Sequence, residues 1–571
     1  MSAALLEHFD LLAGSVGGVA KLRELILSLA VRGRLVPQAP SDEPASELLK
    51  RIRAEKDRLI AEGKIKRDKP LAAIGEEEKP YELPEGWEWI RLNALLSKIG
   101  AGSTPLGGKE VYTLSGVKFL RSQNVWNEGL RLTDVAFIPS ETHMRMSGTV
   151  VLPKDILFNI TGASIGRCAL VSDDFDEANV SQHVTIIRPT LSEVRQFLHL
   201  VLISNHVQQT VMDVQVGVSR EGLSIGKLGQ FLIPLPPLAE QSRIVAKVEE
   251  LMALCDRLEA GQGHAARVQG HWVEAALDQL AESADAEEFR RHWQHLAAHF
   301  DTLFTTPASI DRLDATLLQL AVRGKLVPQD PTDEPVSELL KQIRAEKDRL
   351  IAAGKIKRDK PLPPIVDDEK PYELPDSWEW VRFDEIVEPN KPITYGVLVP
   401  GPDDPNGIPF VRLGDLSLTV PPSLPEKSIS REVDAQYERT RLQGGEILMG
   451  VVGSIGKLGI APSSWRGANI ARAVCRIVPT SLVSKEFAIL LLKSEFMQTS
   501  FIGDTRTVAQ PTLNVGLIRS AMTPLPGRAE QSRIVAQVEK LLALTSDLKT
   551  RLTAAQTKQA HLRDALIAEV C

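Results

Sequence analysis

The sequence predicts an α+β protein in which two similar mixed α/β globules are separated by long helices. Three observations predict this fold class. Most of the chain occurs twice, the middle of each copy carries short apolar runs separated by turn residues, and each copy ends in a long stretch of helical apolar spacing. A chain of 571 residues is also long enough for several domains, each with its own core.

The internal repeat extends over nearly the whole chain. LAVRGRLVPQ begins at Leu29 and LAVRGKLVPQ at Leu320, 291 positions later, and the match continues through YELPEGWEWIRL and YELPDSWEWVRF. AEQSRIVA begins at Ala239 and again at Ala529, 290 positions later. A period this long indicates a tandem of structural units. The two copies span roughly residues 5–280 and 296–570.

Helices are predicted at two places in each copy. Residues 44–62 carry apolar side chains at helical spacing with charges between them. A longer helix of roughly 40 residues, about 60 Å, is predicted after Pro237 in the first copy and at the equivalent place in the second copy. Glu240 and Glu530 lie in its first turn, where a carboxylate favours the helix dipole, and Gly261 and Gly263 predict a break or kink in the first copy. Its apolar positions are Ile244, Val248, Leu251, Cys255 and Leu258 in one copy and Ile534, Val538, Leu541, Thr545 and Leu548 in the other.

The segments between the helices, residues 93–231 and 384–521, are strongly diverged but keep a common skeleton. FLRSQNV aligns with FVRLGDL, ILFNITGASIGR with ILMGVVGSIGK, and ANVSQHV with ANIARAV. Runs such as VKFL, DILFNI and VTIIRP predict strands, and an apolar helix is predicted near Arg195–Leu202. Two domains of one fold with different surface residues are therefore expected.

The composition excludes several classes of protein. There is no stretch of about 18 apolar residues, so no membrane span is predicted, and MSAALLEHFDLLAG lacks the features of a signal peptide. The four cysteines are far apart and form no CxxC pair, so neither a disulfide framework nor a zinc site is predicted, and a cytoplasmic location is expected. The net charge of -7 argues against coating of nucleic acid, but not against a DNA reader with local phosphate contacts.

No catalytic motif is present. GVVGSIGK, from Gly450, is similar to a phosphate loop, but Leu458 stands where Ser or Thr would hold magnesium, and a glycine-bounded turn between strands is favoured. HExxH, GxSxG, Cys/His clusters, convincing dinucleotide or S-adenosylmethionine loops and an NPPY-type tetrapeptide are all missing. The acidic patches Glu76–Lys79 and Asp367–Lys370 fit a solvated turn better than a nuclease carboxylate pair.

Two further features fit either nucleic-acid contact or a structural role. Trp87 and Trp89, repeated at Trp378 and Trp380, lie on one face of a predicted strand; packing of that strand is favoured over stacking on a base. A basic run over residues 50–69 has acids interleaved with it, so a solvated helix face is at least as well supported as phosphate contact.

The motifs together resemble one family. Each half has a GKLVPQ-like segment, a SELLKxIRAEK helix, a KPYELPxxWEWxR entry and a variable domain, and the first half ends in IPLPPLAEQSRIVAKVEELMAL. This order resembles the specificity subunit of type I restriction-modification systems over essentially the whole chain. The second half departs slightly, with PLPGRAEQ in place of PLPPLAEQ.

The resemblance implies a function without catalysis in this chain. Two target recognition domains each read one half of a bipartite double-stranded DNA site, and long helices that pair as an antiparallel coiled coil separate them with pseudo-twofold symmetry. Two adenine-N6 methyltransferase subunits, which hold S-adenosylmethionine, bind the specificity subunit, and two restriction subunits, which use ATP and magnesium, complete the complex. Because the two readers have diverged, an asymmetric site is expected.

The resemblance also implies domain boundaries. They are residues 1–42 for an N-terminal helical segment, 43–236 for recognition domain 1, 237–326 for a central helical spacer, 327–526 for recognition domain 2 and 527–571 for a C-terminal spacer helix.

Polar side chains in the variable domains are the candidate DNA contacts, because Arg, Gln, Asn and Ser can hydrogen-bond base edges. In the first domain they are Arg121, Gln123, Asn124, Thr161, Ser164, Arg167, Gln182 and Arg220. In the second domain they are Arg412, Asp415, Ser454, Lys457, Arg472, Arg506 and Gln510. Gly162, Gly166, Gly453 and Gly456 are expected to hold turns.

Two alternatives belong to other functional classes. A coiled-coil interaction scaffold without direct base reading would account for the acidic net charge. A stand-alone nuclease or methyltransferase is disfavoured by the missing motifs. DNA binding by the assembled complex that is sequence-specific and sensitive to salt separates the first hypothesis from the scaffold.

Overall fold

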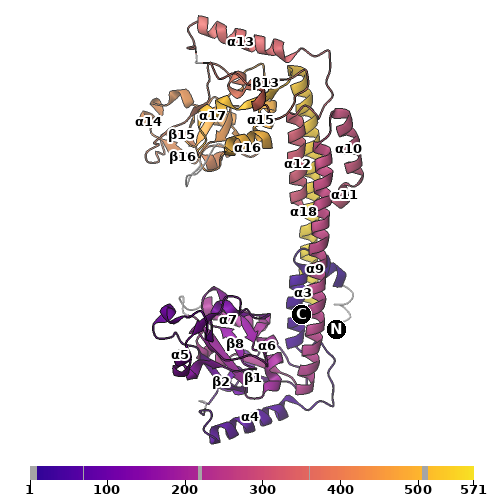
Figure 1. Cartoon of the computed structure of the whole chain (residues 1–571), viewed down its shortest axis with the longest axis vertical. Coiled ribbons are helices and arrows are strands. Elements are labelled where there is room, and N and C mark those ends of the chain that lie inside the picture. The colour runs from indigo at the N-terminus through magenta and orange to yellow at the C-terminus, as the bar shows by residue number, and fades with distance from the viewer. Residues whose placement is uncertain (1–8, 68–69, 217–221, 359–360, 504–511, 571) are drawn as a thin grey trace. The chain divides into compact units, whose positions relative to one another are not determined.

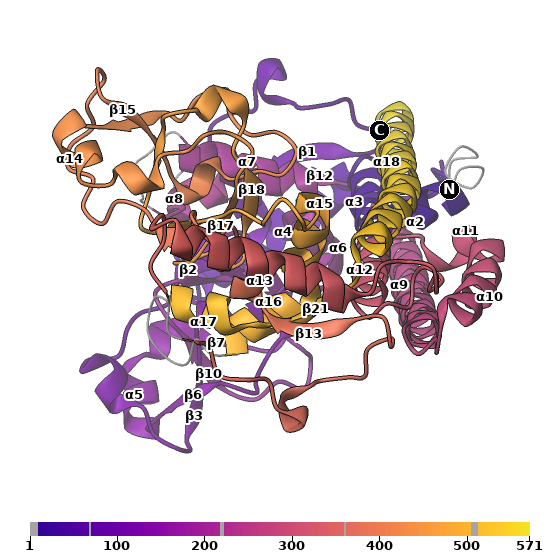
Figure 2. The same ribbon diagram turned by 90° about the horizontal axis from the view of Figure 1, so that it is seen from above.

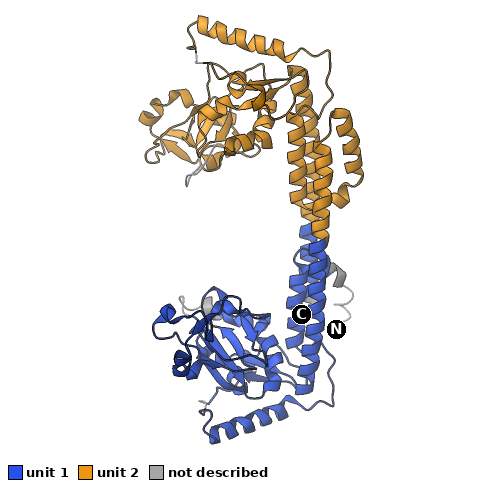
Figure 3. Cartoon of the chain, viewed as in Figure 1, with its two compact units in different colours: residues 1–264, 556–571 blue, residues 265–555 orange. Residues whose placement is uncertain are grey.

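The structure, a computed structural model, describes residues 9–67, 70–216, 222–358, 361–503 and 512–570. It divides into two compact units (Figure 3). Unit 1 comprises residues 1–264 and 556–571, and unit 2 comprises residues 265–555. Two long helices take part in both units: α9 (Leu238–Ala281) begins in unit 1, and α18 (Arg528–Val570) begins in unit 2 (Figure 1).

Unit 1 contains helices and short strands in the mixed order that the sequence predicts. Its other helices are α2 (Phe9–Gly14), α3 (Gly18–Val31), α4 (Ala45–Ala61), α5 (Ser140–Arg145), α6 (Arg195–Ile203), α7 (Asn205–Val216) and α8 (Ile225–Gly229). Its strands are β1 (Glu88–Arg91), β2 (Leu96–Ala101), β3 (Val117–Leu120), β4 (Val125–Trp126), β5 (Gly129–Leu130), β6 (Ala136–Ile138), β7 (Val150–Val151), β8 (Ile156–Asn159), β9 (Cys168–Leu170), β10 (Ala178–Val180), β11 (Val184–Pro189) and β12 (Leu232–Leu235).

Two four-stranded sheets form the variable part of unit 1. Their strand orders are β6-β3-β10-β7 and β2-β11-β8-β9, and only the β3 to β10 pairing is parallel. The runs VKFL, DILFNI and VTIIRP supply β3, β8 and β11, as predicted. β8 is buried along its whole length, which explains its continuous apolar run.

Unit 2 repeats this plan. Its other helices are α10 (Ala286–Ala298), α11 (Phe300–Leu303), α12 (Pro307–Val322), α13 (Val336–Ala352), α14 (Arg431–Ala435), α15 (Lys485–Lys493), α16 (Glu495–Gly503) and α17 (Val515–Ser520). Its strands are β13 (Glu379–Arg382), β14 (Thr394–Tyr395), β15 (Ile408–Val411), β16 (Lys427–Ile429), β17 (Ile447–Gly450), β18 (Leu458–Ile460), β19 (Asn469–Ile470), β20 (Val474–Ile477) and β21 (Met522–Leu525). The sheet orders are β14-β20-β17-β18 and β16-β15-β19, again with one parallel pair, β15 to β19.

The long helices contribute to the core of each unit. In unit 1 the predicted apolar positions of α9 from Ile244 to Cys255 are buried against α3 and the sheet domain. In unit 2, Ile534, Val538 and Leu541 of α18 are buried in one cluster with α12. The helix pair α10 and α11 lies beside α9 in both views (Figures 1 and 2), and Gln269 of α9 donates to the carbonyl of Leu303 at 3.1 Å.

The predicted break at Gly261 and Gly263 is wrong, because α9 continues through both residues to Ala281. Each glycine costs a helix interior about 1 kcal/mol relative to alanine. The buried apolar positions on either side, from Ile244 to Cys255 and from Val273 to Leu280, stabilise the helix by more than that.

A glutamate in the first turn of each long helix accepts hydrogen bonds from other parts of its unit. Trp87 donates from Nε1 to Glu240 Oε2 at 3.0 Å, and Gln38 donates to Glu240 Oε1 at 2.8 Å. In unit 2, Gln329 donates to Glu530 Oε1 at 2.6 Å. Both carboxyl groups are buried, and burial raises the pKa of each. These glutamates therefore act as buried hydrogen-bond acceptors as well as first-turn acids.

None of the helices in the described part of the chain combines the length and the apolar character that a bilayer crossing requires.

Candidate nucleic-acid interface

The topology of unit 1 brings three loops together at one edge. β3 and β10 are parallel, so their carboxyl ends lie side by side, and Ser181 N donates to the Leu120 carbonyl at 2.9 Å. β8 pairs antiparallel with β11, which places the end of β8 beside the start of β11, where Ile160 N donates to the His183 carbonyl at 3.0 Å. The segments 121–124, 160–167 and 181–183 thus form one surface, called here reading edge 1.

Asn159, the last residue of β8, ties two of these loops together. Its side chain is fully buried, and Nδ2 donates to the Ser122 carbonyl at 2.8 Å and to Ser164 Oγ at 3.2 Å. The backbone of the same residue pairs with Gly166 and Arg167. One side chain therefore fixes the loop after β3 against the loop after β8.

The loop between β8 and β9 is a turn held by glycine and glutamine. Gly162 and Gly166 have positive φ values of 75° and 86°, as expected for turn positions. Gln208 of α7 donates to the Gly166 carbonyl at 2.9 Å, and a Cβ on Gly166 would lie 2.4 Å from that glutamine's Oε1. Contacts from outside the turn therefore hold it in place.

Three predicted contacts lie in the loop after β3. Arg121 donates from Nη2 to the Asp134 carbonyl at 2.9 Å, and Gln123 is exposed and donates to Asp134 Oδ2 at 2.6 Å. Asn124 is buried, accepts from Arg121 N at 2.9 Å and donates to the Arg131 carbonyl at 2.9 Å. Its amide holds the turn and is not presented at the surface.

Three more lie in the other two loops of reading edge 1. Thr161 Oγ1 lies 2.6 Å from His183 Nδ1, and exposed Gln182 accepts from Thr104 Oγ1 at 3.1 Å. Ser164 is half-buried as the acceptor of Asn159.

Arg167 stacks on an aromatic ring that the sequence did not single out. Its Cζ lies 3.7 Å from the ring centroid of Trp126, and Arg131 Cζ lies 3.5 Å from the same centroid. The next residue, Cys168, is buried, and burial raises the pKa of its thiol well above its ordinary value. This cysteine is therefore a core residue and not a nucleophile.

The segments that follow the equivalent strands of unit 2, residues 412–415, 451–457 and 471–473, form a second surface, called here reading edge 2. β15 and β19 are parallel, and Ala471 N donates to the Val411 carbonyl at 2.9 Å. Val451 N, directly after β17, donates to the Ala473 carbonyl at 2.8 Å. Gly453 and Gly456 both have φ of 78° in the β17 to β18 turn, so GVVGSIGK is the glycine-bounded turn that was favoured over a phosphate loop.

The described candidates of the second domain all lie on this edge. Arg412 and Asp415 form the loop after β15, where buried Asp415 accepts from Arg412 N at 2.7 Å. Lys457 donates to the Leu413 carbonyl at 2.9 Å. Ser454 is exposed in the β17 to β18 turn, and Arg472 is exposed two residues after the end of β19.

Three candidates, Arg220, Arg506 and Gln510, lie outside the described residues. The chain on their carboxyl side returns to the reading edges: Leu223 N donates to the Ile160 carbonyl at 2.8 Å, and Leu513 N donates to the Val451 carbonyl at 2.8 Å.

The sequence left two aromatic pairs and a basic run open, and the structure assigns them structural roles. Trp87 and Trp378 are buried. The ring of Trp89 packs edge-on against that of Tyr81, with centroids 5.0 Å apart. The run along α4 is mostly paired with neighbouring acids, as for Arg58, which lies 2.6 Å from carboxylate oxygens of Glu55 and Glu62.

The acidic patches have a specific role that the sequence analysis missed. Glu78 lies 2.8 Å from Arg91 Nη2, and Glu369 lies 2.8 Å from Arg382 Nη2. Both arginine side chains are nine-tenths buried, so each acid anchors a strand arginine. The acidic patches therefore lie in turns, as expected, and one acid of each also pairs with a buried strand arginine.

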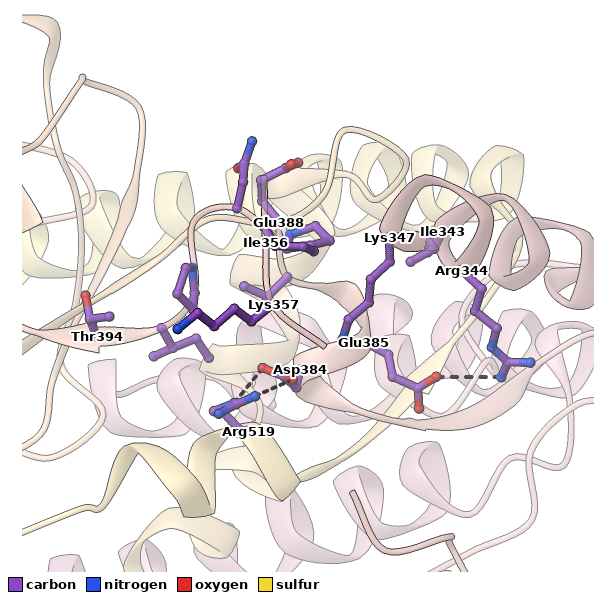
Figure 4. Close-up of a pocket in the computed structure, with 15 residues that line it drawn as sticks. Ile343, Arg344, Lys347, Ile356, Lys357, Asp384, Glu385, Glu388, Thr394 and Arg519 are labelled. Carbon is purple, nitrogen blue, oxygen red and sulfur yellow. Dashed lines mark hydrogen bonds and ion pairs between the residues drawn. The ribbon is translucent and has the colours of Figure 1, made fainter. Parts of the chain in front are cut away.

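A cavity of about 580 Å³ lies in unit 2, away from reading edge 2, and Figure 4 shows its lining. Arg519 donates to Asp384 at 2.8 and 2.9 Å, and Arg344 lies 3.6 Å from Glu385. Each of these acids has an arginine partner, so the pair of carboxylates is occupied by ion pairing. Across the described ranges, no group of three or more His, Cys, Asp or Glu side chains could hold a metal ion.

The two edges thus present hydrogen-bond donors and cations, and the exposed side chains differ between them. The sequence analysis singled out many of their polar residues but missed four residues that contact them from outside: Asn159, Trp126, Arg131 and Gln208. The asparagine at the end of the buried run DILFNI was the one available signal, because a polar residue that ends a buried strand needs a partner.

Comparisons with known proteins agree over both units. The model of the type I restriction modification DNA specificity domain matches residues 84–265 and 375–555. The specificity subunits of the type I restriction enzymes EcoEI and EcoAI, both from Escherichia coli, are 35% and 36% identical to this chain, and each comparison covers 96% of this chain and 93% of the relative. A chain from a solved structure of a type I R-M system is 18% identical with a TM-score of 0.48, covering 86% of this chain and 99% of that chain.

Proposed function

Because the chain belongs to the family of type I restriction-modification specificity subunits, we propose that it reads one bipartite DNA site, one half with each of two recognition domains. These domains are residues 43–236 and 327–526. Residues 1–42, 237–326 and 527–571 supply the helical segments that separate them and receive partner subunits.

One observation carries the proposal. In both units the edge consists of the end of one parallel strand pair and a glycine-bounded turn. The side chains on the edge differ between the units. Arg121, Gln123, Arg167 and Gln182 stand on reading edge 1, and Arg412, Lys457 and Arg472 stand on reading edge 2. Conserved backbone geometry with altered donors is the arrangement that two readers of different half-sites require.

The named residues divide into two roles. Arginine and glutamine side chains at the surface are positioned to hydrogen-bond base edges or phosphates. Asn124, Asp415, Ser164 and Thr161 make hydrogen bonds within the edge and support its shape. Arg220, Arg506 and Gln510 complete the proposed set of contacts.

The chain works in a complex that supplies the chemistry. Two methyltransferase subunits with S-adenosylmethionine transfer the methyl group to adenine N6, and two restriction subunits use ATP and magnesium to cleave unmodified DNA. The long helices set the number of unspecified base pairs between the half-sites. Inserting seven residues, about two helical turns, into α9 should lengthen that spacer, and an unchanged spacer would contradict the role of the helices.

The adenine methylation pattern of the source cells, with and without the gene, tests the proposal. One asymmetric, interrupted motif should be methylated in the parent and unmethylated in the deletion strain, and should return when the gene is restored. Persistence of every methylated motif in the deletion strain, with the methyltransferase subunit expressed, would refute it.

A coiled-coil scaffold is the second candidate function, and the net charge of -7 favours it. In that case the variable domains bind protein, and the assembled complex binds DNA without sequence preference. Measuring affinity for the methylated motif and for a scrambled duplex over a range of salt concentrations separates the two functions.

A further inference from the structure

A three-layer stack of side chains includes Arg167 of reading edge 1 and two neighbouring residues, Trp126 and Arg131. The Cζ atoms of Arg131 and Arg167 lie 3.5 and 3.7 Å from the ring centroid of Trp126. At contact distances this short, each guanidinium lies directly over the ring, and two planar groups cannot occupy one face. The indole is therefore held between two guanidinium groups, one on each face.

The position of the tryptophan is fixed by hydrogen bonds on both sides of the stack. Trp126 donates from Nε1 to the Gln123 carbonyl at 2.8 Å. The neighbouring Asn127 accepts from Cys168 N through Oδ1 at 3.0 Å, which joins the β4–β5 hairpin to the strand that follows Arg167. The hairpin thus holds the ring against Arg167, and the turn that carries Arg167 is itself held by Gln208.

The two arginines differ in their surroundings. Arg131 lies 3.8 Å from Glu128, and both side chains are more than half exposed, so this ion pair is weak. Arg167 has no acidic partner within ion-pair distance among the residues that the structure describes. Its guanidinium contacts the ring face of Trp126, and its charge is not paired with a carboxylate of the described residues, which leaves its N–H groups for a ligand.

Stacking selects the kind of ligand that Arg167 suits. A guanidinium lying flat on a ring keeps one orientation and directs its N–H groups outward in a plane, which matches the two acceptors O6 and N7 of guanine in the major groove. A phosphate can also accept a bidentate pair from arginine, but a lysine point charge satisfies a phosphate, whereas the two guanine acceptors require the planar pair of donors. The equivalent residue in unit 2, Lys457, is not stacked on a ring of the described residues and donates to backbone carbonyls.

We infer that Arg167 reads a guanine in the half-site of the first recognition domain and that Trp126 is its positioning residue. The inference rests on the proposed function and adds a base identity to it. Loss of the bidentate contact should reduce discrimination at that base pair by about 5- to 150-fold.

The test maps methylated sites in cells that express the methyltransferase subunit with the full-length wild-type chain, Arg167→Ala or Arg167→Lys. Arg167→Lys keeps the charge and loses the planar pair of donors, so both variants should relax one G·C position in one half-site and leave the other half-site unchanged. Trp126→Leu should weaken discrimination at the same position. The control Arg145→Ala, an exposed arginine on α5 paired with Glu141, should leave the motif unchanged.

Two results would overturn the inference while leaving the proposed function intact. One is an unchanged motif in both Arg167 variants. The other is uniform weakening at all sequences for Arg167→Ala, with the salt slope of DNA binding reduced by about one, which identifies a phosphate contact. A wild-type chain without any gene-dependent motif would instead refute the proposed function, and the inference with it.

Discussion

The two reading edges share a backbone plan but are held together by different chemistry. In unit 1, the buried side chain of Asn159 bridges the loops after β3 and β8 by hydrogen bonds. The equivalent residue in unit 2 is Gly450, and a Cβ there would lie 2.5 Å from Leu413 Cδ1, so an apolar side chain fills the place of the asparagine. The same turn is thus supported by the hydrogen bonds of Asn159 in unit 1 and by the apolar side chain of Leu413 in unit 2.

Other anchors are the same in both units. Gln208 and Gln498 each donate to the carbonyl of the second turn glycine, at 2.9 and 3.2 Å. Asn179 and Asn469 are buried at equivalent places within the parallel strand pairs, and their side chains donate to the carbonyls of Met146 and Tyr437 at 3.0 and 3.1 Å. The two units therefore share these glutamine and asparagine contacts, although the exposed side chains of the two edges differ.

The largest expected effect on stability comes from placing an asparagine in unit 2 at the position equivalent to Asn159. Gly450→Asn should destabilise the protein by roughly 3 kcal/mol, because its Cβ meets Leu413 and the Ser454 carbonyl, 2.4 Å away. Thermal and denaturant unfolding of the full chain measure the change. Adding Leu413→Ser and one alanine after Gly453, as in ITGASIG, should restore most of the loss, and a failure of this rescue would show that the edges are not equivalent.

Removing the bridge of unit 1 should have the next largest effect. Asn159→Ala leaves the half-buried Ser122 carbonyl without its donor and should cost about 2 kcal/mol of unfolding free energy. The matched variant Ser164→Ala removes one acceptor of the same amide and should cost less. Equal losses for the two variants would contradict the bridging role of Asn159.

The buried glutamates at the helix junctions should give a smaller, pH-dependent effect. Burial raises the pKa of Glu240 and Glu530 in the folded state. A folded pKa above the unfolded value means that folding favours the protonated carboxyl, so this contribution to stability is present at low pH and is lost as pH rises through the folded pKa. Glu240→Gln and Glu530→Gln should flatten the fall in unfolding free energy as the pH rises above the ordinary pKa of glutamate, relative to wild type. A steeper fall in either variant would contradict the assignment.

The smallest effect is expected on α4. Arg58 is exposed and paired with Glu55 and Glu62, so Arg58→Ala should leave the melting temperature and the salt slope of DNA binding unchanged. A salt slope that falls by about one would show that the basic run contacts phosphates.

The sequence predicted what depends on local pattern and repetition. The strand runs, the helix near Arg195–Leu202, the turns at Gly162 and Gly453 and the length of α9 all follow from local spacing and are confirmed. The prediction at Gly261 and Gly263 was wrong because tertiary packing of a long helix outweighs the local cost of glycine.

Features that depend on pairing between distant segments could not be predicted in the same way. The bridge from Asn159 to Ser122 and the stack of Trp126 on Arg167 each join loops that only the sheet topology brings together. The ion pair of Glu78 with Arg91 also links a turn to a buried strand position, which no periodicity reveals. The roles of the candidate DNA contacts remain predictions.

Exchange of one reading segment tests the central claim most directly. Residues 93–231 are replaced by residues 384–521 of the same chain, and methylated sites are mapped in cells that express the methyltransferase subunit. The half-site of unit 1 should disappear and the half-site of unit 2 should be read twice, with the spacing kept. Methylation of the original asymmetric motif, or a change in both half-sites, would contradict the account of two independent readers.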